Sequence, residues 1–181
     1  MKKQVSKTTS TEGNIEESGL KTLFIDELKD ILWAEKHLLK ALPKMAKGAT
    51  SEELRSSIEL HATETENQIK RLEQVFELVG EKVTAKKCEA MEGLVEEGKE
   101  MMEDTETGSL TRDAAIISSS QKIEHYEIAS YGTLRTLANT LGLSEAAALL
   151  EETLEEEKNT DIKLTQIAES FVNESAKAEK E

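Results

Sequence analysis

Four long stretches of this chain repeat large apolar residues at steps of three and four positions. Such steps keep the apolar residues on one side of an α-helix, which turns once in 3.6 residues. The first stretch begins at Leu20 and passes through Phe24 and Leu28 to Met45. The others predict helices from Thr50 to Gly80, over 111–141 and over 144–172. Long helices with one apolar side bury those sides against one another, so the sequence predicts an all-α bundle.

The composition supports helices and argues against a nucleic-acid partner. One Pro, nine Gly and 3% aromatic residues in 181 are too few turn and strand formers for an all-β protein. The chain has 37 acidic and 23 basic residues, a net charge of −14. A surface of that charge repels phosphate backbones, and few aromatic residues are available to stack on bases. We therefore expect no nucleic-acid partner.

The sequence gives no sign of a membrane or secretory segment. No stretch approaches 18 consecutive apolar residues, so we expect no membrane span. The N-terminal residues lack the apolar core of a signal peptide, which leads us to expect a cytoplasmic protein. The single cysteine, Cys88, excludes an internal disulfide and a cysteine-based metal site.

The lengths of the connections indicate how the helices are arranged. We predict a flexible tail over 1–18, one bundle domain over 19–172 and a frayed charged tail over 173–181. Short turns join the first helix to the second and the third to the fourth, whereas residues 81–110 form a long link with a short amphipathic helix. Two hairpins joined by a long crossover describe a ferritin-like four-helix bundle.

Local signals predict three helix boundaries. Thr50 followed by Glu53 fits a capping box at the start of the second helix. Ser144 is expected to cap the fourth helix. Pro43 predicts a kink or an early end of the first helix near Ala41.

Acidic residues stand near the middle of all four apolar stripes, where apolar residues are expected. They are Glu35, Glu64, Glu124, Glu127, Glu157 and Asp161. Carboxylates in a dry interior repel one another and lose hydration, so they must protonate, pair with bases or bind metal. Inward-facing carboxylates from four helices are how bundles bind two iron or manganese ions. With 37 acidic residues, some also fall beside a stripe by chance.

Histidine and tyrosine residues near the acids leave alternatives open. His61 lies one turn before Glu64 and is either a ligand or a buried histidine bonded to a neighbour. The Glu-x-x-His spacing common in ferritin-like sites is absent, since Asn67 follows Glu64 and Thr160 follows Glu157 at that spacing. This absence favours simple metal binding over oxidation chemistry. Gln68 and Tyr131 also face inward.

Five segments resemble the YciE/YciF-type family of ferritin-like proteins. They are DELKDILWAEKHLLKALPKM (26–45), ELHATETENQIKRLEQVFE (59–77), KCEAMEGLVEEGKE (87–100), IEHYEIASYGTLRTLA (123–138) and EEKNTDIKL (156–164). The resemblance implies a ferritin-like bundle with a di-metal centre, associated with bacterial stress responses.

Two functions from different classes remain. The first is a protein that binds two divalent metal ions and acts on a small oxidant such as oxygen or peroxide, with enzymatic activity left open. The second is a metal-free structural or interaction bundle with a vestigial acidic cluster.

Some apolar residues lie outside the single stripe that each helix needs for the bundle core. They are the adjacent pairs Phe24–Ile25, Leu38–Leu39 and Ile116–Ile117, which make the apolar face too wide for one seam. The crossover helix or a second subunit should cover part of this face, and we predict a homodimer.

Overall fold

The computed structural model describes residues 18–179, and within that range all regular secondary structure is helical. The elements are α1 (Gly19–Gly48), α2 (Glu52–Leu78), α3 (Glu89–Glu103), α4 (Leu110–Thr140), α5 (Ser144–Ile167), the π-helical turn η2 (Ala168–Val172) and α6 (Asn173–Ala178). The predicted all-α class is therefore confirmed. The predicted N-terminal tail lies outside the described residues except for Ser18, whose hydroxyl accepts a hydrogen bond from the Lys21 N–H and caps α1.

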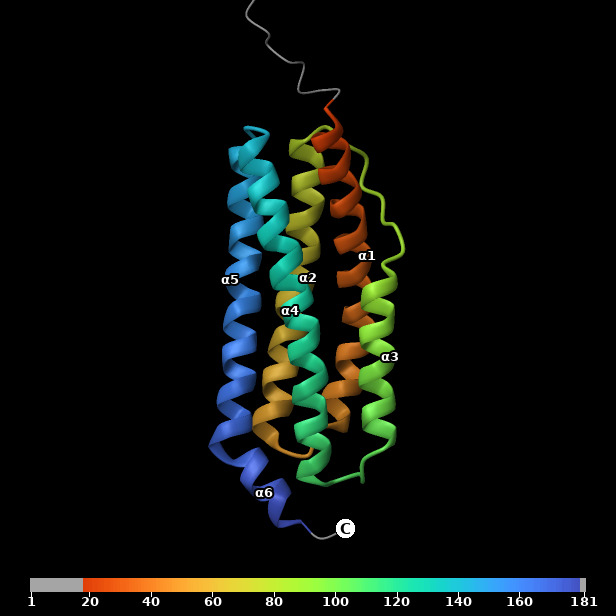
Figure 1. The fold of residues 1–181 in the computed structure, drawn as a ribbon, viewed down its shortest axis with the longest axis vertical. Coiled ribbons are helices and arrows are strands. Elements are labelled where there is room, and N and C mark those ends of the chain that lie inside the picture. The colour runs from red at the N-terminus through yellow and green to blue at the C-terminus, as the bar shows by residue number, and fades with distance from the viewer. Residues whose placement is uncertain (1–17, 180–181) are drawn as a thin grey trace, which may run out of the picture.

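Four long helices stand side by side (Figure 1). Contacts run from α1 to α2, α2 to α5, α5 to α4 and α4 back to α1, which closes a four-sided bundle. The chain passes down α1, up α2, down through α3, up α4 and down α5 (Figure 1). The connection between the two hairpins carries α3, which packs on α1 and α4. This element order is the one expected from the sequence.

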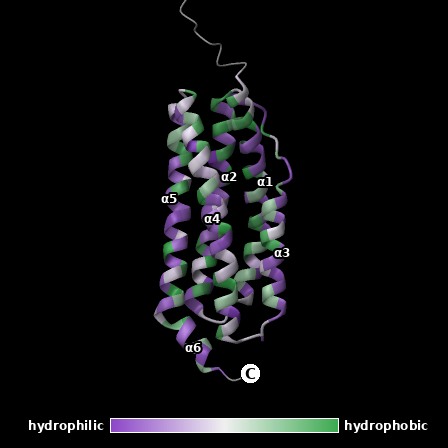
Figure 2. Ribbon diagram, viewed as in Figure 1, coloured by the Kyte–Doolittle hydropathy of each residue, from purple (hydrophilic) through white to green (hydrophobic). Residues whose placement is uncertain are grey.

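Apolar stripes on the long helices form one core. Phe24, Leu28, Ile31 and Leu32 of α1 are completely buried. Burying a side chain of this size contributes about 1.5–3 kcal/mol relative to leaving it exposed. Hydrophilic residues also run along every helix (Figure 2), and on α4 polar residues enter the core itself. Among residues 18–179, no helix is both long and apolar enough to span a bilayer.

The predicted caps of two helices are wrong. Ser51, not Thr50, caps α2, because the Ser51 hydroxyl accepts from the Leu54 N–H while the Thr50 hydroxyl donates to the Ser109 carbonyl. Residue Ser144 is the first residue of α5, and the preceding Leu143 makes no side-chain cap bond. At the start of α2, the Thr50 hydroxyl is engaged by Ser109, which is distant in sequence, so Thr50 does not cap the helix.

Two helix ends can be compared with the expectations. α1 continues through Pro43 to Gly48, so of the two alternatives at Pro43 the early end near Ala41 does not occur. The tail expected to fray from residue 173 instead contains α6, and the Glu179 carboxylate beyond it accepts from the N–H groups of Leu110 and Thr111 at the start of α4. Residues 180 and 181 lie outside the described part of the chain.

Candidate metal centre

Each long helix contributes a buried ligand type to the middle of the bundle. α1 provides Glu35, α2 provides His61, α4 provides Glu124 and Glu127, and α5 provides Glu157. The two α4 residues are three positions apart, so both face the same way. All five residues are at most 3% exposed. Five such polar groups would be costly in an apolar core unless something satisfies them.

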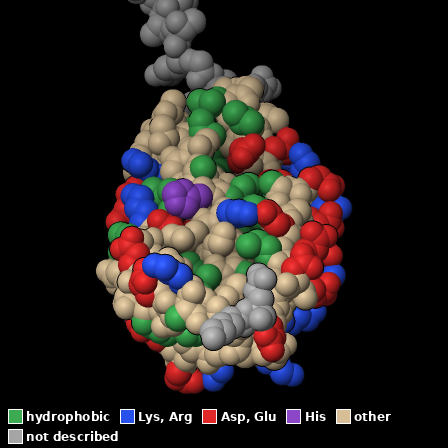
Figure 3. All heavy atoms as spheres, turned by 60° about the horizontal axis from the view of Figure 1, so that its bottom comes forward, with side chains coloured by type: hydrophobic (Ala, Val, Ile, Leu, Met, Phe, Trp, Pro, Cys, Tyr) green, Lys and Arg blue, Asp and Glu red, His purple; other side chains and the backbone are tan. Residues whose placement is uncertain are grey.

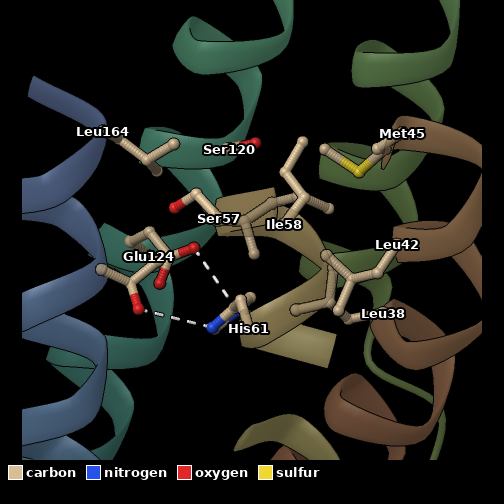
Figure 4. A pocket seen from close by; sticks show the side chains of 11 residues that line it. Leu38, Leu42, Met45, Ser57, Ile58, His61, Ser120, Glu124 and Leu164 are labelled. Atoms are coloured by element: carbon tan, nitrogen blue, oxygen red, sulfur yellow. Dashed lines mark hydrogen bonds and ion pairs between the residues drawn. The ribbon is translucent and has the colours of Figure 1, made fainter. Parts of the chain in front are cut away.

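Four of these residues meet at one point. His61, Glu124, Glu127 and Glu157 each offer one ligand atom, and these atoms lie within 4.8 Å of one another. The His61 Nε2 atom is 3.5 Å from the Glu124 Oε1 atom, and the two side chains face each other across the bundle (Figure 4). Glu35 is close enough for its charge to raise the pKa of Glu127. The cluster therefore draws on all four long helices.

The facing atoms lack hydrogen-bond partners within the described residues. Those without one are Glu35 Oε2, His61 Nε2, Glu124 Oε2, both Glu127 oxygens and Glu157 Oε2. An unpaired buried polar atom costs about 1–3 kcal/mol, and more when it is charged. Native proteins leave few such atoms without a water, an ion or a functional role. Six of them in one cluster point to a bound cation or to protonation.

Burial and mutual repulsion raise the pKa values of all four carboxyl groups. For Glu35, burial is the largest cause and the Glu157 charge is the next. The same two causes lead for Glu124. Burial also raises the pKa of Glu127, followed by the charges of Glu35 and Glu157. Burial raises the pKa of Glu157, whereas the nearby His61 lowers it. A divalent cation would remove this repulsion.

Hydrogen bonds from the surroundings hold two of the carboxyl groups. The Tyr131 hydroxyl, itself fully buried, donates to Glu35 Oε1. The Gln68 amide donates to Glu157 Oε1 and, over 3.1 Å, to Glu156 Oε2. Arg71 in turn binds the Glu156 carboxylate and donates over 2.9 Å to the Thr153 hydroxyl. Each bond leaves one oxygen of Glu35 and of Glu157 free to face the cluster.

The second nitrogen of His61 points toward polar groups at the α2–α5 boundary. Its Nδ1 atom lies 3.4 Å from the Thr160 hydroxyl and 3.7 Å from Glu64 Oε2. Histidines that bind metal through one nitrogen usually hold the other against a carboxylate, a carbonyl or water. This arrangement leaves Nε2 directed at the acidic cluster.

The structure brings together four of the six acids predicted as ligands. Glu35, Glu124, Glu127 and Glu157 converge in the interior. The Glu64 side chain is 31% exposed and lies beside His61 instead. The Asp161 side chain is 21% exposed and lies near Gln121 and His125. The structure places His61 inside the cluster, whereas the sequence left open whether it is a ligand. The signal in the sequence was its position on the apolar stripe, one turn before Glu64.

This donor set has the chemistry of a site for divalent metals. Carboxylate oxygens with one imidazole suit iron, manganese or zinc better than soft copper(I). Four ionised carboxylates carry a charge of about −4, which two divalent ions would balance. The unpartnered oxygens of the cluster fit such an occupant, because each would gain a cationic partner.

Comparisons with known proteins agree with the resemblance described above. The family described as a domain of unknown function, DUF892, matches residues 19–177. Protein YciF of Escherichia coli K12 is 51% identical over 158 residues, which cover 87% of this chain and 95% of that protein. The crystal structure of the E. coli stress protein YciF matches with a TM-score of 0.82 and covers 86% of this chain and 98% of its own.

A second solved structure is similar over the same share of the chain. It is that of YcfI from Rhodopseudomonas palustris, which is 38% identical with a TM-score of 0.78, covering 86% of this chain and 98% of its own. The predicted relationship to YciF-type proteins is thereby confirmed.

Proposed function

Because this chain belongs to the DUF892 family, whose description assigns no activity, we propose from its own geometry that it is a ferritin-like bundle that binds two divalent metal ions, iron or manganese. One observation carries the proposal. All four long helices place a buried carboxylate or imidazole at the same level, with six ligand-type atoms that have no partner within the described residues. A bundle that needed only packing would place apolar side chains there.

The residues divide naturally between two ions. His61, Glu124, Glu127 and Glu157 would hold the first ion, since their ligand atoms already approach one another. Glu35, whose charge acts on Glu127, would contribute to holding the second ion. Direct ligation by Glu64 and Asp161 stays a prediction. In the arrangement described here, Glu64 is better placed to orient His61 through Nδ1.

Bound iron or manganese would supply electron transfer to a small oxidant such as oxygen or peroxide. The chain itself would position and shield the ions. Tyr131 fixes one oxygen of Glu35, and Gln68 fixes one oxygen of Glu157, so that the remaining oxygens face the ions. Apolar residues such as Leu38 and Ile123 lie beside the cluster and keep bulk water away. The relative described as a stress protein supports a role in stress physiology.

A second function, from another class, has one observation in its favour. The raised pKa values of the four buried glutamates allow them to be neutral, and neutral carboxyl groups are much less costly to bury than charged ones. A structural or interaction bundle with a vestigial, protonated cluster would therefore also tolerate these residues.

Metal analysis separates the two functions. The protein is purified without chelator, supplied with ferrous or manganous ion without oxygen, desalted and submitted to elemental analysis. The proposal expects about two metals per chain. Glu124→Ala and Glu157→Ala should each lose at least one, whereas Glu155→Ala, at an exposed position on the same helix as Glu157, should lose none. Absence of metal from the unsubstituted protein, or unchanged stoichiometry in the central variants, would overturn the proposal.

A further inference from the structure

A small pocket lies inside the bundle beside the acidic cluster (Figure 4). Of the eleven residues that line it, nine are buried. The two that are partly exposed are Ser57 of α2 and Thr160 of α5. The pocket therefore meets the surface between these neighbouring helices, at a mouth formed by the Ser57 and Thr160 side chains. His61 and Glu124 of the cluster line its inner part.

Polar atoms continue inward from this mouth. Ser120 is 6% exposed and lines the pocket, and its hydroxyl has no hydrogen-bond partner within the described residues. The same holds for His61 Nε2 and Glu124 Oε2. Hydroxyl, carboxylate and imidazole groups all offer lone pairs to a metal ion, and none of the eleven lining residues is Lys or Arg. The polar side of the pocket therefore suits a cation.

The charged residues along the α2–α5 boundary place a carboxylate beside the mouth. Two ion pairs cross this boundary, Lys163 with Glu53 over 2.6 Å and Arg71 with Glu156. Glu64 stands between them along α2, with its side chain 31% exposed and its Oε2 atom 3.7 Å from His61 Nδ1. The Thr160 hydroxyl approaches the same nitrogen, at 3.4 Å. The Glu64 charge is thus placed to attract cations from solution to the mouth.

The surface pocket between α1 and α2 is less suited to ions. Lys47 and Arg55 line it, so a cation there meets two positive charges. It shares Leu42 and Ile58 with the inner pocket. Both of these residues are buried and aliphatic, and they offer no lone pair to an ion.

We propose that divalent metal ions reach the cluster between α2 and α5, past the Ser57 and Thr160 hydroxyls, and that Glu64 is the carboxylate that receives them from solution. The proposal rests on the proposed function, because the ions that enter are those that the cluster binds. The pocket volume of about 10 Å³ admits one water-sized occupant. An entering ion therefore exchanges most of its water for protein ligands, and the hydroxyls of the mouth and of Ser120 replace part of that water.

The test measures the rates of metal binding and release separately from the amount bound. Metal-free protein is mixed rapidly with manganous ion without oxygen, uptake is followed by EPR spectroscopy, and release is followed after adding excess chelator. Ser57→Leu fills the mouth, so we expect uptake and release both to slow on the order of tenfold, with the final stoichiometry unchanged. A residue on the path changes both rates by the same factor, whereas a ligand changes the affinity. Ser56→Leu, the same change at the exposed neighbouring position, should alter neither rate.

A second variant tests the receiving carboxylate and serves also if Ser57→Leu fails to fold. Glu64→Gln keeps the shape of the side chain and removes its charge, so uptake should slow severalfold and depend less on ionic strength. Glu66→Gln, at an exposed position of α2, should retain the rate and the salt dependence of the unsubstituted protein. Faster release with unchanged uptake in Glu64→Gln would mean that Glu64 only orients His61, and would overturn its role in entry.

Failure of the path and failure of metal binding give different results. Full loading at equal rates in Ser57→Leu and Ser56→Leu would remove the path and leave the metal centre standing. Absence of bound ion in the unsubstituted protein would remove both.

Discussion

Gln68 shows at the scale of single residues how the cluster depends on side chains around it. Its amide bridges Glu157, which faces the cluster, and Glu156, which Arg71 binds from the outer side. A chain of bonds thus runs from a partly exposed guanidinium to a buried carboxyl group. Hydrogen bonds that orient metal ligands commonly change metal affinity when they are lost.

Gln68→Leu should weaken metal binding without removing the ligands. The substitution keeps the side chain's approximate volume and deletes the bond that orients Glu157, so we expect the affinity to fall by about 10- to 100-fold. Competition titration against a chelator of known affinity measures the change. Asn67→Leu, at the exposed neighbouring position, is the control. Equal affinities of the two variants would mean that Gln68 does not position a ligand.

Helical spacing predicted only part of which acids lie inside the bundle. Glu35, Glu124 and Glu157 occupy stripe positions, which follow from the local period alone, and they are buried. Asp161 was also expected on a stripe but its side chain is 21% exposed, whereas Glu127, expected at a stripe edge like Glu64, is fully buried. Glu64 is at the edge of its stripe, where exposure depends on the rotation of α2 about its axis. That rotation is set by packing against α1 and α5, which one sequence does not reveal. The same packing decides that His61 is directed inward.

At the scale of helices, Asp113 shows most clearly how one element holds another in place. It lies fully buried on α4, and its carboxylate accepts from the N–H groups of Thr50 and Ser51, 2.6 and 2.8 Å away. These donors precede α2, whose N-terminus carries partial positive charge. One carboxylate therefore fixes the α1–α2 turn to the start of α4.

Asp113→Ala should destabilise the fold. The change leaves two N–H groups in the turn without their acceptor, for which we expect a loss of about 1–3 kcal/mol in the free energy of unfolding. Denaturant unfolding measures it. Asp104→Ala, at an exposed position, serves as control and should change the free energy little. A loss no larger than that of the control would show that water replaces Asp113.

The same contact explains why helix existence was easier to predict than helix ends. The apolar period extends over many residues, so the four long helices follow from the sequence. The cap of α2 depends on partners more than 50 residues away, which occupy Thr50 and leave Ser51 to cap. Likewise Glu179, distant in sequence, supplies the acceptor for the N–H groups of Leu110 and Thr111, while the local Ser109 hydroxyl accepts from the Arg112 N–H.

The association state is a prediction about the whole molecule. The apolar pairs on which the expected homodimer rested are mostly covered within one chain, since Phe24, Ile25, Ile116 and Ile117 are buried. On one face, hydrophobic side chains lie in small groups between charged ones (Figure 3). Leu60 on α2 and Ile162 on the adjacent α5 remain more than half exposed and are the candidates for contact with a second copy.

We expect sedimentation at micromolar concentration to give about twice the chain mass of 20.1 kDa. Leu60→Lys should then lower the mass toward that of one chain, because a charge in an apolar interface is costly to desolvate. Leu23→Lys, at an exposed position on α1, is the matched control. A mass of one chain for the unsubstituted protein contradicts the dimer.

The acidic cluster also determines how stability depends on pH. A carboxyl group with a higher pKa in the folded than in the unfolded state binds more protons when folded, so protonation favours folding. Glu35, Glu124, Glu127 and Glu157 all have such raised pKa values. Their contribution to the free energy of unfolding is complete below the ordinary pKa of 4.5 and is lost as the pH rises through the pKa values of the folded state. The metal-free protein should therefore become more stable as the pH falls from neutral to about 5.5.

Bound metal should reverse this trend. An ion that binds the ionised cluster stabilises only the folded state, and protons compete with it for the carboxylates. We expect the melting temperature of the manganese-loaded protein to fall between pH 7.5 and 5.5, while that of the metal-free protein rises. Glu127→Gln removes one of the titrating groups and should flatten the rise, whereas Glu155→Gln, on the exposed side of α5, should preserve it. A metal-free melting temperature that only falls over this range would show that the four carboxyl groups do not crowd one another in solution.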